Sequence, residues 1–460
     1  MPRPSTLRPH RPATETIVAI ATASAPSGIG IVRLSGPDAI SIGQRLFRAR
    51  DPLGKCPRRV DHGLVLGGDG QEIDQGLAWV FPAPRSYTGE DTVEISCHGS
   101  LVVLEALVRA AVGAGAVLAG PGEFTRRAFL NGKMDLVQAE AVVDLIHASG
   151  RFTLDNAYGL LKGRLSAEVG EIKRELLRAL AHTEALLDFP EEVAIGGQDI
   201  AAAVARTCQR CAALTATFTT FSRRQEGIGV AIIGPPNAGK SSVFNLLLKE
   251  SRAIVSPIPG TTRDLIEARL YIDGELFRLV DTAGLRTTTD PIEVEGVARA
   301  HGAATEADIR LLVLDSSLPW DIAWDSMVAK LVPDRDLVVL NKSDLPRVLP
   351  GFAAAGFRVV SISALTGDGV GGLLDALRLS LGPSPVGSAT GLVHLRHFDC
   401  LSRVEGYLRN AQGILGSDEI ALECVAEELR AAIDQVHVLL GTQASEEVLD
   451  LVFSEFCIGK

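Results

Sequence analysis

The spacing of hydrophobic residues divides the chain into regions of different texture. From about Thr16 to Gly120, short runs with β-like alternation are separated by turns, and a helix-like stretch occupies Leu101–Val112. The β-like runs are Thr16–Thr22, Ile29–Leu34, Leu77–Phe81 and Thr92–Ser96. Short strands of this kind with one helix predict a compact α+β domain.

Two later regions have the periodicity of amphipathic helices. From Met134 to about Phe221 and from Cys400 to Phe456, hydrophobic residues recur at steps of three and four. The residues in step are Leu165, Val169, Ile172, Leu176 and Leu180 in the first region and Leu422, Val425, Leu429, Ile433 and Val436 in the second. The first region leaves a charged group outside, made of Lys173, Arg174, Glu175 and Arg178. Such a group could contact RNA, but a solvated helix face is the commoner meaning.

Between the helical regions, from Gly227 to about Leu381, strands alternate with helices. This alternation predicts an α/β domain. The simplest arrangement is an α/β domain inserted into a helical domain whose two halves meet in space. A chain of 460 residues is long enough for two or three domains.

Composition and charge narrow the class of protein. Hydrophobic residues make up 46% of the chain and charged residues 22%, as in ordinary globular proteins. A net charge of −11 opposes nucleic-acid binding over most of the surface, so an RNA contact would need a local basic patch. No apolar run is long enough to predict a membrane span. The segment Met1–Pro12 lacks the apolar core of a secretory signal and is expected to be a disordered tail.

Seven scattered cysteines do not predict a disulfide framework, and a reduced, cytoplasmic location is expected. The close pair Cys208 and Cys211 lies in a helical stretch and has no second pair to complete a zinc site. Two thiols that pack between helices are the preferred interpretation.

The strongest chemical motif opens the inserted domain. The apolar run Gly229–Ile233 leads into Gly234-Pro-Pro-Asn-Ala-Gly-Lys-Ser241, and the helical stretch Ser242–Lys249 follows. A strand, this glycine-rich loop and a helix form a phosphate-binding loop, in which backbone N–H groups point at the phosphates. Lys240 would supply positive charge between the β- and γ-phosphates, and the Ser241 hydroxyl would bind Mg²⁺.

Two switch motifs follow in the order that a Ras-like GTPase requires. The strand Phe277–Val280 ends in Asp281-Thr-Ala-Gly284, whose aspartate fits an indirect role in holding Mg²⁺. The N–H group of the glycine in this motif could reach the γ-phosphate. Upstream, Thr262 in Gly260-Thr-Thr-Arg-Asp264 is the expected hydroxyl ligand of Mg²⁺ in the switch loop.

Residues that can recognise the base come next. The strand Leu337–Leu340 delivers Asn341-Lys-Ser-Asp344, and the Asp344 carboxylate can accept hydrogen bonds from N1–H and the exocyclic amine of guanine. Adenine lacks both donors, and the unpaired carboxylate would disfavour it by about 10⁴-fold. The N–H group of Ala364, in Ser361-Ile-Ser-Ala364, would bind the guanine oxygen. The predicted nucleotide is therefore GTP, and the predicted activity is its hydrolysis.

Hydrolysis in this chain requires an unusual way to position water. Ras-like switches often carry a glutamine directly after the Asp-x-x-Gly motif, and this chain has Leu285 there. No arginine finger can be assigned from the sequence. Another residue must therefore orient the water, and another cation must neutralise the developing charge.

Further motifs are spread along almost the whole chain from about Thr16. They are the phosphate loop with Asn237, Asp281-Thr-Ala-Gly-Leu-Arg286, Ser86-Tyr-Thr-Gly-Glu-Asp91, His98-Gly99, Pro121-Gly-Glu-Phe-Thr125, Phe129-Leu-Asn-Gly-Lys133, Asp135-Leu-Val-Gln-Ala-Glu140 and the terminal Phe456-Cys-Ile-Gly-Lys460. On these residues the chain resembles the MnmE (TrmE) family of tRNA-modification GTPases. The terminal Cys-Ile-Gly-Lys is specific among GTPases.

The resemblance implies a function and partners. Together with MnmG (GidA), an FAD protein, members add an aminomethyl or carboxymethylaminomethyl group to carbon 5 of the wobble uridine in certain tRNAs. The implied one-carbon donor is a reduced folate, 5-formyl- or methylene-tetrahydrofolate. The resemblance also implies a homodimer through the N-terminal domains, a heterotetramer with MnmG, and GTP hydrolysis that begins when two G domains pair across K⁺.

Residue roles in the G domain follow from the same resemblance. Glu293 aligns with the family's catalytic glutamate, which orients the attacking water through a second water; composition alone would make it a solvated helix residue. The implied K⁺ ligands are Asn237, Ser256, Ile258 and Thr261. The predicted GTP-binding residues are Asn237, Ala238, Gly239, Lys240, Ser241, Ser242, Ser256, Thr261, Thr262, Asp281, Thr282, Ala283, Gly284, Asn341, Lys342, Asp344, Ser363 and Ala364. Departures from the family pattern are Pro235, Pro291 and Ser256, of which the last keeps a hydroxyl.

The implied folate site consists of Arg33, Glu94, Lys133 and Lys460. Strand alternation supports part of it, because Glu94, Ser96 and His98 share one face while Val93, Ile95 and Cys97 share the other. Arg33 and Lys133 could also be ordinary surface charges. Cys457 is implied to act in the modification as nucleophile, acid or structural element, although a lone cysteine is usually an inert packing residue.

The predicted fold is a multidomain α/β protein with three parts. They are an N-terminal α+β folate-binding and dimerisation domain (1–130), a discontinuous helical domain (131–224 and 384–460) and an inserted Ras-like P-loop G domain (225–383). The alternative function is a GTP-dependent ribosome-assembly factor of the Era or Der type. The sequence shows no suitable Gly-x-x-Gly KH loop after the G domain and no second G domain. A mechanical GTPase of dynamin type, the third interpretation, would need a membrane-binding region.

Overall fold

The computed structural model describes residues 15–23, 25–189, 197–250, 267–281, 307–349, 356–381 and 391–459. The chain forms two compact units. Unit 1 comprises Met1–Ile146, Leu160–Cys211 and Asp399–Lys460, and unit 2 comprises His147–Gly159 and Ala212–Phe398. The tail expected at Met1–Pro12 lies outside the described residues.

Unit 1 begins with a seven-stranded sheet of strand order β3-β4-β5-β6-β2-β1-β7. Its strands are β1 (Ile17–Ile20), β2 (Ser27–Ser35), β3 (Phe47–Ala49), β4 (Asp61–Leu66), β5 (Glu72–Phe81), β6 (Thr92–Gly99) and β7 (Val117–Leu118). Neighbouring strands are antiparallel except for β1 and β7, which are parallel. All four predicted β-like runs lie in strands, whereas the hydrophobic pattern gave no indication of β3, β4 or β7.

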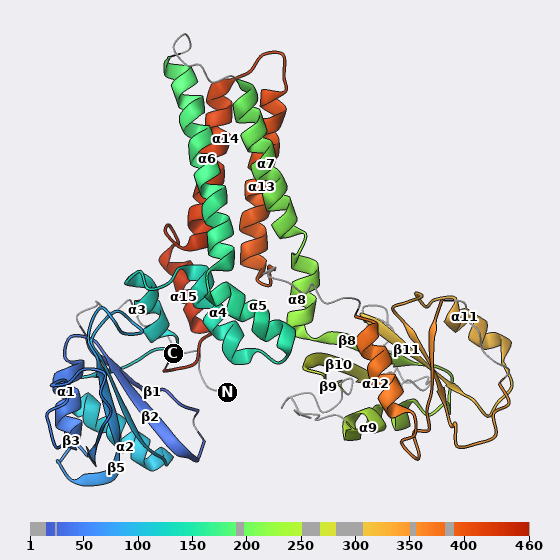
Figure 1. The fold of residues 1–460 in the computed structure, drawn as a ribbon, viewed down its shortest axis with the longest axis horizontal. Coiled ribbons are helices and arrows are strands. Elements are labelled where there is room, and N and C mark those ends of the chain that lie inside the picture. The colour runs from blue at the N-terminus through green and yellow to red at the C-terminus, as the bar shows by residue number, and fades with distance from the viewer. Residues whose placement is uncertain are drawn as a thin grey trace, which may run out of the picture. The chain divides into compact units, whose positions relative to one another are not determined.

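The two faces of this sheet differ in what covers them. Helices α1 (Ala39–Leu46) and α2 (Leu101–Gly113) pack on one face, where Val93, Ile95 and Cys97 of β6 enter the core (Figure 1). The alternation predicted for β6 is therefore confirmed, because it leaves Glu94 for the second face. Helix α3 (Glu123–Leu130) contributes the fully buried Phe124 to a small core with Ile17 and Ala19 of β1.

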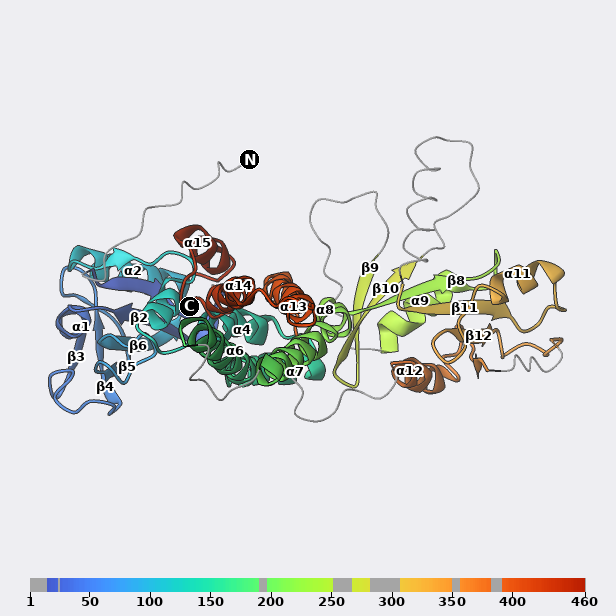
Figure 2. The same ribbon diagram turned by 90° about the horizontal axis from the view of Figure 1, so that it is seen from above.

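The predicted helical region is described on both sides of the gaps at 190–196 and 382–390, and most of its helices belong to unit 1. The helices of this region include α4 (Leu136–His147), α5 (Arg151–Leu161), α6 (Arg164–Asp188), α7 (Gly197–Thr215), α13 (Leu395–Leu415), α14 (Leu422–Leu440) and α15 (Glu446–Ser454). Helices α6, α7, α13 and α14 lie alongside one another in both Figure 1 and Figure 2. The two halves of the helical domain, which the inserted domain separates in the sequence, thus meet in space as predicted.

The predicted helical stripes form the core of this bundle. Of the ten hydrophobic residues named for these stripes, eight are buried, and Leu180 and Leu422 are half-buried. In the charged group of α6, Glu175 is not a free surface charge, because it accepts hydrogen bonds from Thr207 and Arg210 of α7. Cys208 and Cys211 are buried in α7, and burial raises the pKa of the Cys211 thiol to about 12. Both cysteines are therefore packing thiols, as expected.

Unit 2 contains a six-stranded sheet of strand order β13-β12-β11-β8-β10-β9. Its elements are α8 (Phe218–Glu226), β8 (Ile228–Ile233), α9 (Lys240–Glu250), β9 (Glu267–Ile272), β10 (Glu275–Asp281), β11 (Ile309–Asp315), η1 (Ile322–Trp324), α11 (Asp325–Val328), β12 (Leu337–Asn341), β13 (Arg358–Ser361) and α12 (Val370–Leu379). All neighbouring strands are parallel except β9 and β10. The predicted alternation of strands and helices is confirmed.

Both faces of this sheet are covered, and alternate residues of β11 show it. Leu311 and Val313 pack with α9 and α12 on one face, while Leu312 and Leu314 pack with Trp324 on the other. A parallel sheet buried on both faces brings the carboxyl ends of its strands, and the loops that follow them, to one edge. Across the described part of the chain, no helix is both long and apolar enough to cross a membrane.

Candidate functional site

The phosphate loop joins the end of β8 to the first turn of α9. Gly234 has a φ of +145°, and a Cβ atom there would lie 2.2 Å from the Val313 backbone oxygen. Gly239 has a φ of +93°, and a Cβ atom there would lie 2.2 Å from Nδ2 of Asn341. Neither position can hold a side chain, so both glycines of the motif are required by the shape of the loop.

The loop is suited to an anion. Helix α9 begins at Lys240, which directs its N-terminal N–H groups and the positive end of its dipole at the loop. The Lys240 ammonium lies back over the loop and donates to the backbone oxygens of Gly234 (3.0 Å) and Pro235 (2.9 Å). Asn237 is exposed and has a φ of +62°, and Ser241 and Ser242 lie at the start of the helix, where both are exposed. These residues fit a bound phosphate with its Mg²⁺.

Asn341 connects the phosphate loop to the base-recognition loop. Its side chain, 2% exposed, donates from Nδ2 to the Ala238 backbone oxygen (2.9 Å). Its Oδ1 accepts from the backbone N–H of Ala364 (3.0 Å). One buried amide therefore fixes the spacing between the two loops, and the predicted set Ala238, Asn341 and Ala364 is brought together.

The remaining residues predicted to recognise the base are held by their neighbours. The Ser363 hydroxyl donates to Oδ1 of Asp344 at 2.5 Å, which orients this carboxylate. Lys342 has a φ of +62° and forms an ion pair with Asp315 at 2.6 Å. Burial alone would raise the pKa of Asp315, but hydrogen bonds from Lys342 and Ser317 outweigh it and hold the pKa below its usual value.

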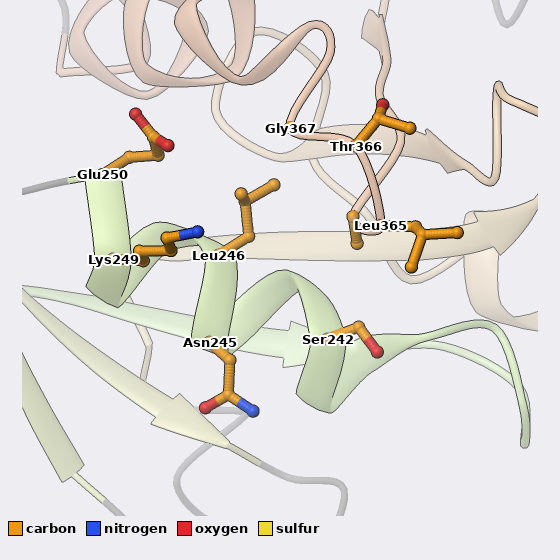
Figure 3. Close-up of a pocket in the computed structure, with 9 residues that line it drawn as sticks. Ser242, Asn245, Leu246, Lys249, Glu250, Leu365, Thr366 and Gly367 are labelled. Carbon is orange, nitrogen blue, oxygen red and sulfur yellow. The ribbon is translucent and has the colours of Figure 1, made fainter.

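A cavity of about 320 Å³ borders this site (Figure 3). One wall is the outward face of α9, with Ser242, Asn245 and Lys249, and the other is the loop that follows β13. Ala364, the predicted partner of the guanine oxygen, contributes to the lining. The cavity therefore shares Ala364 with the residues predicted to recognise the base, but Asn341 and Asp344 do not line it.

Several predicted residues cannot be placed. Asp281 pairs in parallel register with Ile232 of β8, so its backbone reaches the same sheet edge as the phosphate loop. The predicted residues that lie outside the described ranges are Ser256, Ile258, Thr261, Thr262, Thr282, Ala283, Gly284, Glu293 and Lys460. Their roles stay predictions.

A second polar cluster lies on the second face of the N-terminal sheet. Arg33 of β2 and Glu94 of β6 are directly opposite in the strand register, and Nε of Arg33 donates to Glu94 at 2.7 Å. The other oxygen of Glu94 accepts from the indole N–H of Trp79 at 2.9 Å. The Arg33 guanidinium also lies 5.6 Å from the ring centres of both Tyr87 and Phe124. Two predicted folate residues are thus adjacent and are flanked by aromatic side chains. We call this group, Arg33, Glu94, Trp79, Tyr87 and Phe124, the Arg33 cluster.

The Lys133 ammonium is exposed and donates to the backbone oxygen of Pro84 (3.0 Å), and its place in the folate site stays a prediction. The sequence prediction also omitted Trp79, Tyr87 and Phe124 from the cluster. Alternation in β5 places Trp79 on the face opposite Ala78 and Val80, but the register that brings it to Glu94 is not visible in the sequence.

The C-terminal segment reaches the same cluster. Arg33 donates to the backbone oxygen of Gly459 at 3.3 Å, and Pro121 forms an antiparallel bridge with Ile458. Cys457 is exposed and its backbone oxygen accepts from the N–H of Gly122 (3.4 Å). The thiol therefore lies in a segment that contacts the Arg33 cluster.

Comparison with known proteins assigns the chain to a family. Residues 136–457 match the MnmE helical domain, and residues 16–133 match the GTP-binding protein TrmE N-terminus. The chain belongs to the MnmE family. The tRNA modification GTPase MnmE of Chloroflexus aurantiacus is 43% identical over 452 residues, which cover 97% of this chain and 100% of that protein. The MnmE protein of one Thermus thermophilus strain is 41% identical over 452 residues, with coverage of 97% and 99%.

Among solved structures, Era of Aquifex aeolicus is 25% identical, with a TM-score of 0.27 and coverage of 39% of this chain and 66% of that chain.

Family membership confirms three predictions: the resemblance itself, the three-part fold with an inserted G domain, and the assignment of the chain as a GTP hydrolase.

Proposed function

We propose that the chain uses GTP hydrolysis to drive modification of carbon 5 of the tRNA wobble uridine. The addition of an aminomethyl or carboxymethylaminomethyl group would take place with MnmG as partner and a reduced folate as one-carbon donor, in the cytoplasm. Membership of a family whose relatives are named tRNA modification GTPases supports the tRNA substrate. The observation that carries the proposal is the contact between Arg33, of the predicted folate site, and Gly459, two residues after Cys457.

In the G domain, the predicted site residues would each act in nucleotide binding or hydrolysis. Lys240 would neutralise charge on the β- and γ-phosphates, and the α9 amides would bind the β-phosphate. Asp344 and the Ala364 N–H would select guanine, while Asn341 keeps their loop in register with the phosphate loop. Ser241 and Thr262 would hold Mg²⁺, which supplies electrostatic stabilisation of the transferred phosphoryl group.

Leu285 cannot orient water, so the proposal assigns that role to Glu293. Asn237, with Ser256, Ile258 and Thr261, would hold K⁺ when two G domains pair within a homodimer. The exposed position and left-handed backbone of Asn237 support a role for its side chain outside the loop. GTP turnover should be many times faster in K⁺ than in Na⁺ at equal ionic strength, and equal rates would remove K⁺ from the mechanism.

The decisive experiment is mass spectrometry of tRNA nucleosides from cells that lack this protein, complemented with the wild-type chain or with Cys457→Ser. Wobble uridines of the carboxymethylaminomethyl type should be absent in the deletion, return with the wild type, and stay absent with the variant. Unchanged nucleosides in the deletion would reject the proposal and favour a GTP-dependent role in ribosome assembly. Full restoration by Cys457→Ser would retain the function and remove Cys457 from it.

A further inference from the structure

Backbone contacts hold the C-terminal segment, here residues 455–459, on the N-terminal domain. The bridge between Pro121 and Ile458 and the hydrogen bond from Gly122 fix it beside the start of α3. Gly459 has a φ of +97°, and a Cβ atom there would lie 2.2 Å from the Ile20 backbone oxygen. The segment therefore fits closely between β1 and α3, and its position depends on where α15 delivers it.

Helix α15 itself packs on α3 at short range. Gly122 has a φ of +63°, and a Cβ atom there would lie 2.7 Å from the Phe453 backbone oxygen. The side chains of Phe453 and Phe456 are 2% and 5% exposed, so apolar burial supplies much of the attraction. Apolar contact is non-directional, however, and does not by itself set how far α15 slides or rotates along α3.

The side chain of Arg126 supplies the directional contact between α3 and α15. Arg126 of α3 donates from Nη1 to Oδ1 of Asp450 at 2.6 Å, and its Nη2 pairs with Glu446. Asp450 and Glu446 are four residues apart and so lie on one face of α15, one turn from each other. A guanidinium has separate donors for two carboxylates, whereas a lysine ammonium is a single point charge. Arg126 therefore spans a full turn of α15 and fixes its register.

Stability alone does not explain this arrangement. The Arg126 side chain is 17% exposed, and its Nε is buried without a hydrogen-bond partner among the described residues. Desolvation of such a group offsets part of the attraction between charges, so the contact stabilises the packing of α15 only modestly while it specifies the geometry. The next residue, Arg127, forms its ion pairs with Glu90 and Glu123, which both lie in the N-terminal domain.

We propose that Arg126 is a positioning residue that places Cys457 beside the Arg33 cluster by locking α15 onto α3. The inference rests on the proposed function, because the position of Cys457 matters only if this residue takes part in the modification. Arg126 contacts neither the thiol nor Arg33 through any hydrogen bond between described residues, so it acts through α15 and the segment that follows it.

Carboxypeptidase digestion of the full-length chain tests the lock directly, because trimming as far as Cys457 requires the segment to leave its place. Arg126→Met should be trimmed roughly tenfold faster than the wild type, the effect expected from losing charge-assisted hydrogen bonds. Arg126→Glu combined with Asp450→Arg restores one of the two ion pairs and leaves Glu446 beside a like charge, so it should restore slow trimming in part. The control is Arg430→Met, which removes a more exposed ion pair, with Glu184, between α14 and α6 and should leave the rate unchanged. Wild-type trimming of Arg126→Met would overturn the proposal.

The tRNA nucleoside assay then separates this inference from the proposed function. Arg126→Met should lose at least about tenfold of its modification rate while GTP hydrolysis is unchanged, and the reversed pair should recover part of it. If Arg126→Met frees the segment but modifies tRNA normally, while Cys457→Ser does not, the positioning role is overturned. If Cys457→Ser also modifies tRNA normally, Cys457 takes no part in the modification, and that part of the proposed function fails. The contact of Arg126 with α15 would then serve only to hold the two helices together.

Discussion

The guanine-nucleotide site and the Arg33 cluster are built in opposite ways. In the first, each motif is a short contiguous run, and a strand of the parallel sheet delivers it to a common edge. In the second, the contact between Arg33 and Gly459 joins residues 426 positions apart. A site made of contiguous motifs can be recognised in the sequence before any fold is known, whereas a site made of long-range contacts cannot.

The two sites also differ in what they leave for a ligand. Asn341 satisfies its amide with loop backbone, and Asp344 is oriented by one hydroxyl, so most of its acceptor capacity is available to a base. Glu94 already accepts from Arg33 on one oxygen and from Trp79 on the other. The nucleotide site is therefore preorganised for its ligand, while a ligand at the Arg33 cluster has to share or replace existing contacts.

The largest expected effect comes from Asp344→Asn. The amide cannot accept from both guanine donors and presents a donor of its own, so GTP affinity should fall by about two to three orders of magnitude. Xanthosine triphosphate, which offers an acceptor at the altered position, should become the preferred nucleotide. Dissociation constants for the two nucleotides measure the switch. Ser363→Ala, which removes only the orienting hydroxyl, is the control and should cost no more than about tenfold. Retained preference for GTP in Asp344→Asn would mean that the base is recognised elsewhere.

The sequence was sufficient for most of the G domain because periodicity and loop chemistry coincide there. The run before Gly234 is a strand, the stretch after Lys240 is a helix, and both glycines of the loop have positive φ values that only glycine adopts easily. The ion pair between Lys342 and Asp315 was not predicted, because no motif links the end of β11 to the end of β12. Their proximity follows from strand order, which hydrophobic periodicity does not specify.

In the N-terminal domain the sequence predicted faces but not neighbours. Alternation placed Glu94 opposite Val93 and Ile95, and the structure confirms it. The pairing of β5 with β6 that brings Trp79 to Glu94 depends on register, and register depends on turns and on contacts with the rest of the fold. Lys133 is a residue that only the family resemblance suggested; its ammonium donates to the Pro84 backbone oxygen, and its part in folate binding stays a prediction.

The intermediate effect should come from breaking the Arg33–Glu94 pair. Both side chains are largely buried, at 15% and 14% exposure, so Arg33→Met would leave a buried carboxylate without its cation and destabilise the domain by roughly 3 kcal/mol. The double variant Arg33→Met with Glu94→Gln should be less destabilised than the single variant, because no charge is left unpaired. Hydrogen exchange of peptides from β2 and β6 measures both, and GTP affinity serves as the unchanged control. Equal destabilisation in both variants would show that packing of the arginine, and not its charge, supports the cluster.

The smallest expected effect concerns the Lys342–Asp315 pair and appears only in acid. Because the folded-state pKa of Asp315 is held below its ordinary value of 3.8, the ionised pair contributes stability that is present above that value. This contribution is lost as pH falls through the lower folded-state pKa, when the carboxylate protonates. Asp315→Asn should therefore be less stable than the wild type at neutral pH, and the gap should close below about pH 4. Urea unfolding followed by the fluorescence of Trp320 and Trp324 in a Trp79→Phe background measures it, since both indoles lie in unit 2. A gap that is independent of pH would assign the role of Asp315 to its hydrogen bonds with Ser317, which an amide can partly replace.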